Sequence, residues 1–538
     1  MPQPLGGCAA LRLPFAPGPL HYARMHVAGH KQRPPLHHLE KWFLGLVLTQ
    51  LIFMPWVFGT MHMWSQISAL GLAALGFAVA LWPRVYDGDH GISFRAERSE
   101  IGNLKPEGSN ISGPRSQLSG FRINPLPRLL KFPLFWLGLA LLAYLGLQAL
   151  NPSWIWERSA TTWWLRRVND IPWLPTSIDT PYERFNLWRQ FIIYTTVWLT
   201  VCALWIGITR RKTLHILLGV LVANACILGL IGFVHKASGA EKLLWLQAFP
   251  NASSFASFVY QNHAGAYFSL MSFVALGLAV WHFFEGRKRM ARSTPSALWL
   301  IASLLLVFAV VFSLSRGAMI SLTVFGLAAV IAIVILRFSS STRSTIPTII
   351  PVMVALGIVG TVGWMIRQVD FSAVYVRFEQ LSKLQANDPS VLSRKLAREA
   401  AIEMYGDHWV RGVGAGGFRH LFPEYVKRKP MIYDGGRLFW EHAHNDWLEI
   451  PIELGLTGVV LFVMALGWVG WTWTRNGGWR HPVTLMIALG AGQVMAHATM
   501  DFPFQNPAIL ATWWALLAIS LRWLELDAPQ TAHDGRSA

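Results

Sequence analysis

The sequence predicts an all-α polytopic membrane protein with about 12 transmembrane helices, and three observations support this fold class. Hydrophobic residues make up 53% of the 538 residues and charged residues only 14%, whereas soluble domains carry about 25% charged residues. Twelve apolar runs approach the roughly 20 residues that a helix needs to cross the hydrocarbon layer. The remaining polar residues gather in a few segments between these runs. The same apolar content excludes a mainly disordered chain.

The predicted spans are runs with almost no charge, because a charged residue at the centre of a spanning helix costs about 2.5 to 3.5 kcal/mol. The tenth run is an exception, since Glu449 and Glu453 lie near its start. In chain order the runs are Trp42–Thr60, Ser65–Trp82, Phe132–Leu150, Phe191–Ile208, Leu214–Val234, Val259–Phe284, Ala297–Leu314, Gly317–Leu336, Thr348–Ile366, Leu448–Thr474, Val483–Met500 and Pro507–Leu521.

Basic residues in the short connections predict the orientation of the chain. The connections that carry Arg210–Lys212, Arg287–Arg292 and Arg475–Arg480 fall on one side, together with segment 83–131. The positive-inside rule assigns that side to the cytoplasm. An even number of spans then places both termini in the cytoplasm.

This orientation divides the chain into five parts, of which the largest polar one is a periplasmic loop of roughly 80 residues. The parts are a cytoplasmic tail at 1–41, nine spans at 42–366 with a cytoplasmic loop at 83–131, the large periplasmic loop at 367–447, three spans at 448–523 and a cytoplasmic tail at 524–538. Segments 151–190 and 235–258 share the periplasmic side with the large loop.

The cysteine content argues against certain binding sites, and the net charge indicates the kind of partner that the protein binds. Cys8, Cys202 and Cys226 form no closely spaced pair, so we expect neither a metal site nor a disulfide framework. The formal net charge of +18 suits an anionic partner, such as a membrane surface or a phosphate-bearing ligand. The first 30 residues have no continuous apolar core, so we expect no signal peptide.

The large loop contains a predicted amphipathic helix. From Ser390 onward, apolar residues recur at helical spacing, while Arg394 and Arg398 lie around the rest of the helix. This pattern predicts a helix that lies on the membrane or over a cavity. Its arginines could bind a ligand or simply contact water and lipid headgroups.

The stretch Gly412–Gly417 matches the G-x-G-x-x-G pattern of dinucleotide-binding proteins. We reject that function, because no βαβ unit surrounds the glycines and they lie in the periplasmic loop. A tight turn at the end of the preceding helix is the favoured interpretation. A turn whose amides face a pyrophosphate is the alternative.

His442 and His444 lie just ahead of a predicted span. In an extended segment both would point to the same side, and a histidine can act as a base at neutral pH. Asp446 and Glu449 resemble a capping box that starts the next helix, so His444 would lie ahead of a helix N-terminus, which favours anions. The pair lacks a credible third ligand for a metal. Two surface histidines without a role are the other alternative.

Two further polar features lie at the predicted outer membrane face. Arg316 follows a connection of almost no residues, so it could anchor in lipid headgroups or bind two oxygens of a lipid-linked phosphate. His497 and Asp501 are four residues apart and share a face if their helix continues. They could be a mutually satisfied pair or part of a functional site, which is the default hypothesis for ionisable groups in a membrane.

Together these motifs resemble those of the O-antigen ligase and O-antigen polymerase superfamily of integral membrane glycosyltransferases. The similarity spans roughly Leu214 to Trp523, and it does not separate the ligase, polymerase and protein-glycosylating branches. The cytoplasmic segment Pro83–Lys131 is longer than is usual in the family. The residues that carry the resemblance are Gln261-Asn262-His263, Ser315-Arg316-Gly317, the Arg394/Arg398 segment leading to Gly412–Phe418, His442-Ala443-His444-Asn445-Asp446-Trp447-Leu448-Glu449 and Glu453-Leu454-Gly455-Leu456-Thr457-Gly458.

The resemblance implies a GT-C-type helical fold in the bacterial inner membrane, with a large periplasmic loop over a lipid-facing cavity. It implies transfer of a glycan from undecaprenyl diphosphate to an acceptor hydroxyl, without a required metal, and we expect no other cofactor. On this chain His444 would be the base that deprotonates the acceptor, and His442 would position it.

The resemblance also implies a set of residues that bind the substrates. Arg316 and Arg394 or Arg398 would hold the diphosphate as it leaves, and Asp501 would orient a partner such as an arginine or the acceptor. Asn445 and Glu449, which belong to the histidine motif, are further candidates for substrate binding.

The acceptor is left open between three possibilities. Transfer to lipid A-core, as by an O-antigen ligase, is preferred, while a second lipid-linked glycan or a protein would indicate a polymerase or a protein O-oligosaccharyltransferase. No nucleic-acid partner is expected. A transporter or flippase is less favoured, because transporters place ionisable groups near the bilayer midplane in repeated halves. Here the polar groups collect at one outer face instead.

Overall fold

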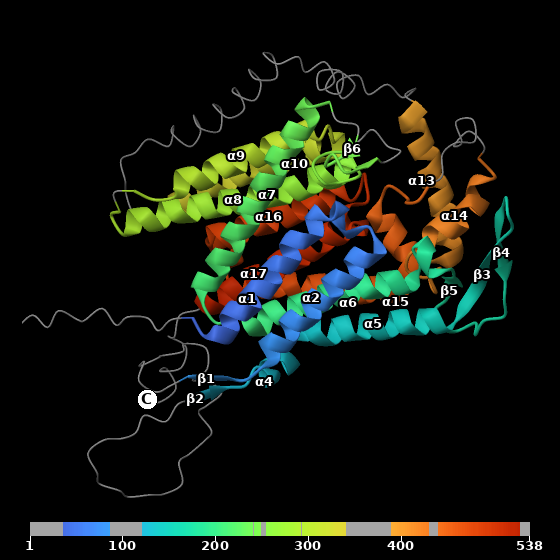
Figure 1. Cartoon of the computed structure of the whole chain (residues 1–538), viewed down its shortest axis with the longest axis horizontal. Coiled ribbons are helices and arrows are strands. Elements are labelled where there is room, and N and C mark those ends of the chain that lie inside the picture. The colour runs from blue at the N-terminus through green and yellow to red at the C-terminus, as the bar shows by residue number, and fades with distance from the viewer. Residues whose placement is uncertain are drawn as a thin grey trace, which may run out of the picture.

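The computed structural model describes residues 36–86, 121–239, 242–248, 254–291, 293–339, 389–429 and 440–527. These residues form a bundle of long helices with three small sheets (Figure 1). The prediction of an all-α polytopic membrane protein is thereby confirmed.

Eight helices within these ranges are long and apolar enough to cross a membrane. They are α2 (Met63–Leu81), α5 (Pro133–Leu150), α6 (Leu187–Gly207), α7 (Arg211–Ala237), α8 (Gln261–Lys288), α10 (Arg316–Ser339), α15 (Asp446–Arg475) and α17 (Pro507–Asp527). Shorter apolar helices are α9 (Ser296–Phe312) and α16 (Pro482–His497), and α1 (His38–Trp56) precedes them all. The described helices coincide with all the predicted runs except Thr348–Ile366, which lies outside the described residues.

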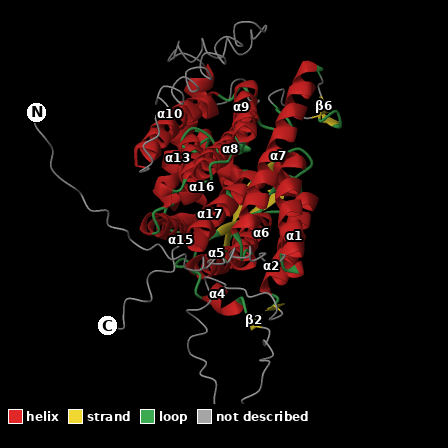
Figure 2. Ribbon diagram, turned by 90° about the vertical axis from the view of Figure 1, so that its left-hand side faces the viewer, coloured by secondary structure: helices red, strands yellow, loops and turns green. Residues whose placement is uncertain are grey.

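The helix at the centre of the bundle is buried, whereas an outer helix exposes apolar side chains, as expected for a protein in lipid. Helix α8 packs against α7, α9, α10 and α16, and its residues between Ala264 and Leu278 are almost all buried. Figure 2 shows α16 and α17 between α10 on one side and α1 and α7 on the other. Helix α10 instead exposes an apolar stripe that suits contact with hydrocarbon. The stripe consists of Ile320, Val324, Leu327, Ile331 and Ile335.

Most described elements outside the spans gather at one end of the bundle, here called the polar end (right in Figure 1). A three-stranded sheet lies there in the order β4 (Trp163–Arg167), β3 (Pro152–Arg158) and β5 (Ser177–Asp179), with α13 (Pro389–His408) and α14 (Phe418–Val426) beside it. The predicted periplasmic segments 151–190 and 367–447 therefore have described parts at the same end.

The remaining small elements connect the spans. Strands β1 (Arg84–Tyr86) and β2 (Phe121–Ile123) pair near α4 (Leu126–Leu130) at the other end of the bundle (Figure 1). A further hairpin consists of β6 (Lys242–Leu243) and β7 (Gln247–Ala248), and the short 3-10 helices are η1 (Phe58–Thr60), η3 (Tyr182–Arg184), η6 (Gly478–Arg480) and η7 (Pro503–Gln505).

The glycine-rich stretch forms a tight turn that ends α13, which confirms the favoured interpretation. The Gly412 N–H donates to the His408 carbonyl over 2.8 Å, and φ is positive at Gly412, Gly414 and Gly416. The Val413 and Gly414 amides donate to carbonyls of α15 over 2.9 and 3.0 Å. These two amides are already paired, so the pyrophosphate-facing alternative finds no support in them.

Replacing Gly412 by alanine should destabilise the protein. The new Cβ would collide with the Glu453 carbonyl oxygen, and φ of +71° disfavours any side chain, which by itself costs of order 1 to 3 kcal/mol. The melting temperature of the purified protein in detergent should fall clearly. The matched control is Gly406→Ala in α13, where no neighbouring atom lies within 4 Å of the new Cβ. Equal melting temperatures for the two variants would contradict the turn's role.

Candidate active site

Three carboxylates on one face of α15 hold three separate segments together at the polar end. Asp446, Glu449 and Glu453 are spaced three and four residues apart, so they share a helix face, and all three are buried. Each accepts a backbone N–H from a different segment: Asp446 from Phe504, Glu449 from Ala443 and Glu453 from Phe418, at 2.9, 2.7 and 3.2 Å. Since a buried carboxylate requires hydrogen bonds, these acids draw the three segments onto the start of α15.

His442 lies in a chain of hydrogen bonds that occupies both of its ring nitrogens. Nδ1 is 2.7 Å from Glu449 Oε1, and Nε2 is 3.1 Å from Nη2 of Arg419. A guanidinium can only donate, so Nε2 accepts from Arg419 and Nδ1 carries the proton that it donates to Glu449. Burial and the nearby Arg419 charge lower the pKa of His442 well below its ordinary value. A neutral imidazole with hydrogen bonds at both nitrogens is suited to holding the segment in place. It is not suited to taking a proton from a substrate.

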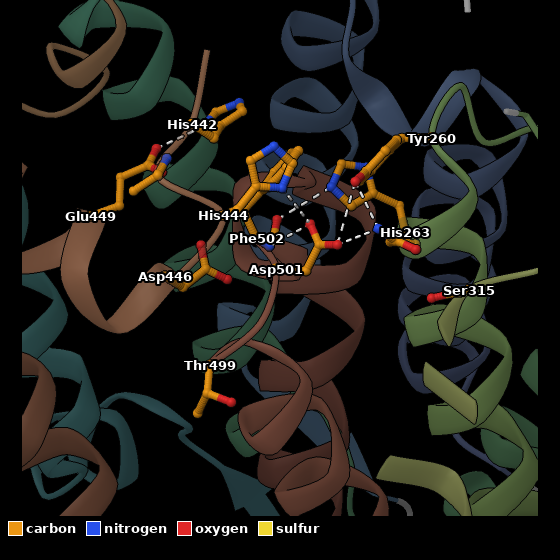
Figure 3. Close-up of polar contacts among 12 residues, drawn as sticks. Tyr260, His263, Ser315, His442, His444, Asp446, Glu449, Thr499, Asp501 and Phe502 are labelled. Carbon is orange, nitrogen blue, oxygen red and sulfur yellow. Dashed lines mark hydrogen bonds and ion pairs between the residues drawn. The ribbon is translucent and has the colours of Figure 1, made fainter. Parts of the chain in front are cut away.

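His444 has a different environment, although it is only two residues further along. Its side chain is 21% exposed, and its Nδ1 lies 3.5 Å from Oδ1 of Asp501 (Figure 3). Neither ring nitrogen of His444 forms a hydrogen bond with a residue in the described ranges, so Nδ1 approaches the Asp501 carboxylate without being bonded to it. A carboxylate at Nδ1 favours the tautomer whose Nε2 is an acceptor, which is the arrangement of a general base.

The backbone at this segment corrects two local predictions. His444 has φ of +50°, so the segment is not extended there, and the nitrogens of His442 and His444 face different carboxylates. The N-cap of α15 is Asn445, whose Oδ1 accepts from the Trp447 N–H over 3.0 Å. Asp446 is therefore the first helical residue rather than the start of a capping box, and Asn445 has a structural role.

Asp501 is buried within a cluster of polar groups from three segments. Its Oδ2 accepts from the Asn262 amide and, over 3.4 Å, from the Tyr260 hydroxyl. Its Oδ1 accepts from the Phe502 N–H over 3.0 Å and faces His444. These donors fix the carboxylate, so it can in turn orient the His444 ring.

The alternative of a mutually satisfied pair of His497 and Asp501 is not found, because α16 ends at His497 and no hydrogen bond joins the two side chains. Neither ring nitrogen of His497 has a hydrogen-bond partner among the described residues. The His497 ring instead packs against Gly317, where a Cβ would lie 2.9 Å from it.

The three arginines predicted to bind phosphate differ in their positions and contacts. Nη2 of Arg398 donates to the Thr499 carbonyl over 3.3 Å, which brings α13 to the loop that carries Asp501. Arg316 is the first residue of α10 and is half-buried. The side chain of Arg394, which belongs to α13, lies outside the described part of the structure.

Several residues of this cluster had no role in the sequence-based prediction. The motif Gln261-Asn262-His263 was identified, but nothing local indicated that Asn262 would reach Asp501. Arg419 was one of many basic residues in the large loop. Phe502 carries no polar group, yet His442 stacks on its ring at 4.4 Å between centroids and His444 meets its ring at 4.9 Å and 80°.

The comparison with known families covers part of this cluster. A family model described as O-antigen ligase matches residues 301–463. That stretch includes Arg316, α13 and the histidine motif, whereas Asn262 and Asp501 lie outside it. The match confirms the resemblance to this superfamily. A search of curated proteins finds no match for the chain.

The stability of the folded protein should decrease in mild acid, partly through His442. Its pKa in the folded state is lowered, so the unfolded chain binds more protons once the pH falls below about 6.5. Stability contributed by the neutral ring is thus fully present above that pH. It declines below it by up to about 1.4 kcal/mol per pH unit. We expect the melting temperature in detergent to fall between pH 7 and pH 5.

The variant His442→Gln tests this prediction, because glutamine keeps one donor and one acceptor but does not titrate. The melting temperature of this variant should fall less than that of the wild type over the same pH range. His38→Gln, at an exposed position, is the control and should follow the wild type. The same loss in all three proteins would show that His442 does not contribute.

Proposed function

We propose that this protein acts as a glycosyltransferase of the O-antigen ligase superfamily, which transfers a glycan from a polyprenyl diphosphate to an acceptor hydroxyl with His444 as the general base. The observation that carries the proposal is the pairing of a half-buried His444 with the buried Asp501. Nδ1 faces the carboxylate, and Nε2 is left for a substrate. The remaining polar side chains of the cluster support this pair rather than compete with it.

The reaction needs one proton transfer and one bond exchange. Nε2 of His444 takes the proton of the acceptor hydroxyl, and the oxygen attacks the anomeric carbon of the donor sugar. The bond from that carbon to the diphosphate breaks, and the polyprenyl diphosphate leaves with the electron pair. Asp501 stabilises the imidazolium that forms, as the acid of a catalytic triad does. General-base catalysis of this kind contributes typically 10²- to 10⁴-fold.

The leaving diphosphate requires fixed positive charge. Negative charge grows on its oxygen in the transition state, and cations that are already in place lower the barrier. We assign this role to Arg316, Arg398 and Arg394. The contact of Arg398 with Thr499 supports the assignment, because it holds a guanidinium beside the loop of Asp501.

Transfer to lipid A-core at the periplasmic face of the bacterial inner membrane is the preferred version of this function. The orientation predicted from the basic connections supports that face, and the polar end carries the described parts of the predicted periplasmic segments. A second lipid-linked glycan or a protein as acceptor would make the enzyme a polymerase or a protein O-oligosaccharyltransferase.

The acceptor can be identified by reconstitution. Purified protein in vesicles is supplied with a labelled undecaprenyl-diphosphate glycan and, separately, with lipid A-core, a second lipid-linked unit or a pilin-like peptide. We expect label on lipid A-core. Label on one of the other two would overturn the ligase version, and no transfer to any of them would count against the glycosyltransferase itself.

His444→Ala should reduce transfer by about 100-fold or more, because the general base is lost. Asp501→Asn should also slow transfer, since an amide does not stabilise the imidazolium. His442→Gln should retain most activity, because its donor and acceptor pattern is preserved. Rates are compared in vesicles at matched protein content, with melting temperatures as the check on folding. A fully active His444→Ala enzyme would refute the assignment of the base.

Arg316→Lys should lose much of its activity at saturating donor, because an ammonium cannot bind two phosphate oxygens in fork geometry. The matched control is Arg428→Lys, since the Arg428 side chain is 71% exposed and its ionic partner is Glu403 rather than a residue of the cluster. The measurement is the initial rate of transfer. Equal rates for both variants would argue against a diphosphate contact at Arg316.

A further inference from the structure

A cavity of about 290 Å³ opens beside the histidine segment at the polar end. It lies between the β3–β4 hairpin, the connection from η3 into α6, and the start of α14. Arg419 belongs both to its wall and to the contact with His442. The cavity therefore adjoins the His444 site, and its volume is just below the roughly 300 to 1,000 Å³ of typical ligand pockets.

Two guanidinium groups, of the buried Arg189 and the largely buried Arg419, lie at one side of this cavity against the same aromatic ring. The Cζ atoms of Arg189 and Arg419 lie 4.8 and 4.6 Å from the centre of the Phe185 ring. Phe185 has φ of +53°, a backbone conformation that is unfavourable for a residue with a side chain and that clusters at functional sites. Two like charges are thus held together in a place where both are largely removed from water.

Neither arginine forms an ion pair with a buried carboxylate in the described part of the chain, although Glu183 and Glu441 also line the cavity. Arg189 donates to Gln66 Oε1 and to the Met61 carbonyl, over 3.1 and 2.8 Å, and both acceptors are neutral. Arg419 donates to the neutral His442, and its nearest carboxylate, Glu441, is 3.8 Å away and mostly exposed. A buried cation without a matching anion is costly. The geometry therefore favours an anionic group between the two guanidiniums.

The cavity is also lined by two tryptophans of the hairpin. Trp156 and Trp163 stack at 6.3 Å between ring centres, and the guanidinium of Arg184 lies 5.3 Å from the Trp156 ring. The rings come from one face of the hairpin, because side chains alternate along each strand. Flat aromatic faces next to polar groups suit a pyranose ring, whose C–H bonds pack on the indole while its hydroxyls bond at the edges.

We propose that this cavity binds an acidic sugar residue, with its carboxylate between Arg189 and Arg419 and its ring against Trp163. The inference rests on the proposed glycan transfer and adds a requirement for charge on the glycan. The carboxylate accepts the free guanidinium donors in charge-assisted hydrogen bonds. Through the bond from Arg419 to His442, the bound sugar is adjacent to the segment that positions His444.

Binding is measured by calorimetry on the full-length protein in detergent micelles. The probes are an oligosaccharide that contains glucuronic acid and the same oligosaccharide after reduction of its carboxyl groups, which differ only in the acid. We expect the acidic form to bind about tenfold more tightly or better. Equal affinities would overturn the proposal. Competition by inorganic pyrophosphate at the affinity of the acidic probe would overturn it too, in favour of a phosphate site.

Variants on the two faces of one strand locate the binding site. Trp163→Ala should abolish most of the binding, whereas Trp164→Ala should bind as the wild type, because Trp164 points to the opposite face and contacts Glu157. The two indoles are similarly exposed, at 37% and 45%. Arg189→Gln should remove the preference for the acidic probe, with the melting temperature as a check on folding. Preserved binding in Trp163→Ala would place the sugar elsewhere.

The transfer assay separates this inference from the proposed function. Acidic and carboxyl-reduced glycans are placed in turn on the donor and on the acceptor. A preference for acid on one of them identifies which glycan occupies the cavity. Equal transfer rates with the acidic and the carboxyl-reduced glycan, on both the donor and the acceptor, would overturn the inference. They would leave the proposed glycosyltransferase function standing. Acid-selective binding without any transfer would instead contradict the proposed function.

Discussion

The site depends on the burial of three carboxylates in the first two turns of α15. A buried carboxylate is tolerated only when hydrogen bonds replace the water that it has lost. Asp446, Glu449 and Glu453 meet this requirement with backbone amides from three different segments. The loop before α15, the glycine turn and the connection between α16 and α17 therefore converge on one helix end. Without this convergence, Asp501 and His444 would belong to unrelated loops.

The convergence gives two neighbouring histidines separate roles. Glu449 and Arg419 occupy both nitrogens of His442, so that ring is fixed and neutral. The left-handed backbone at His444 then turns the next ring toward Asp501, and its second nitrogen remains available. Residues locked by outer hydrogen bonds hold reactive groups to within a fraction of an ångström. His442 is best understood as such a support, and the strained backbone next to it fits a functional position.

The sequence was sufficient for features that depend on local patterns. Apolar runs located the described spans, and the glycine spacing located the turn after α13. The histidine motif and Asp501 were identified as candidates, but not as partners. That contact joins residues 57 positions apart, with α15 and α16 between them in the chain. Asn262 and Arg419 are long-range in the same way. No periodicity encodes which of many basic residues in a loop will meet a given imidazole.

The charged residues of the site form two groups with different tasks. Asp446, Glu449, Glu453 and Asp501 are buried acids, and Arg398, Arg419 and Arg189 are the cations near them. The buried acids accept hydrogen bonds from backbone amides and from His442, so their charge is partly satisfied within the protein. The cations keep donors for a ligand and raise its local concentration. Under the proposed function, an anionic donor would meet fixed positive charge first, and its leaving group would develop charge where that field is already in place.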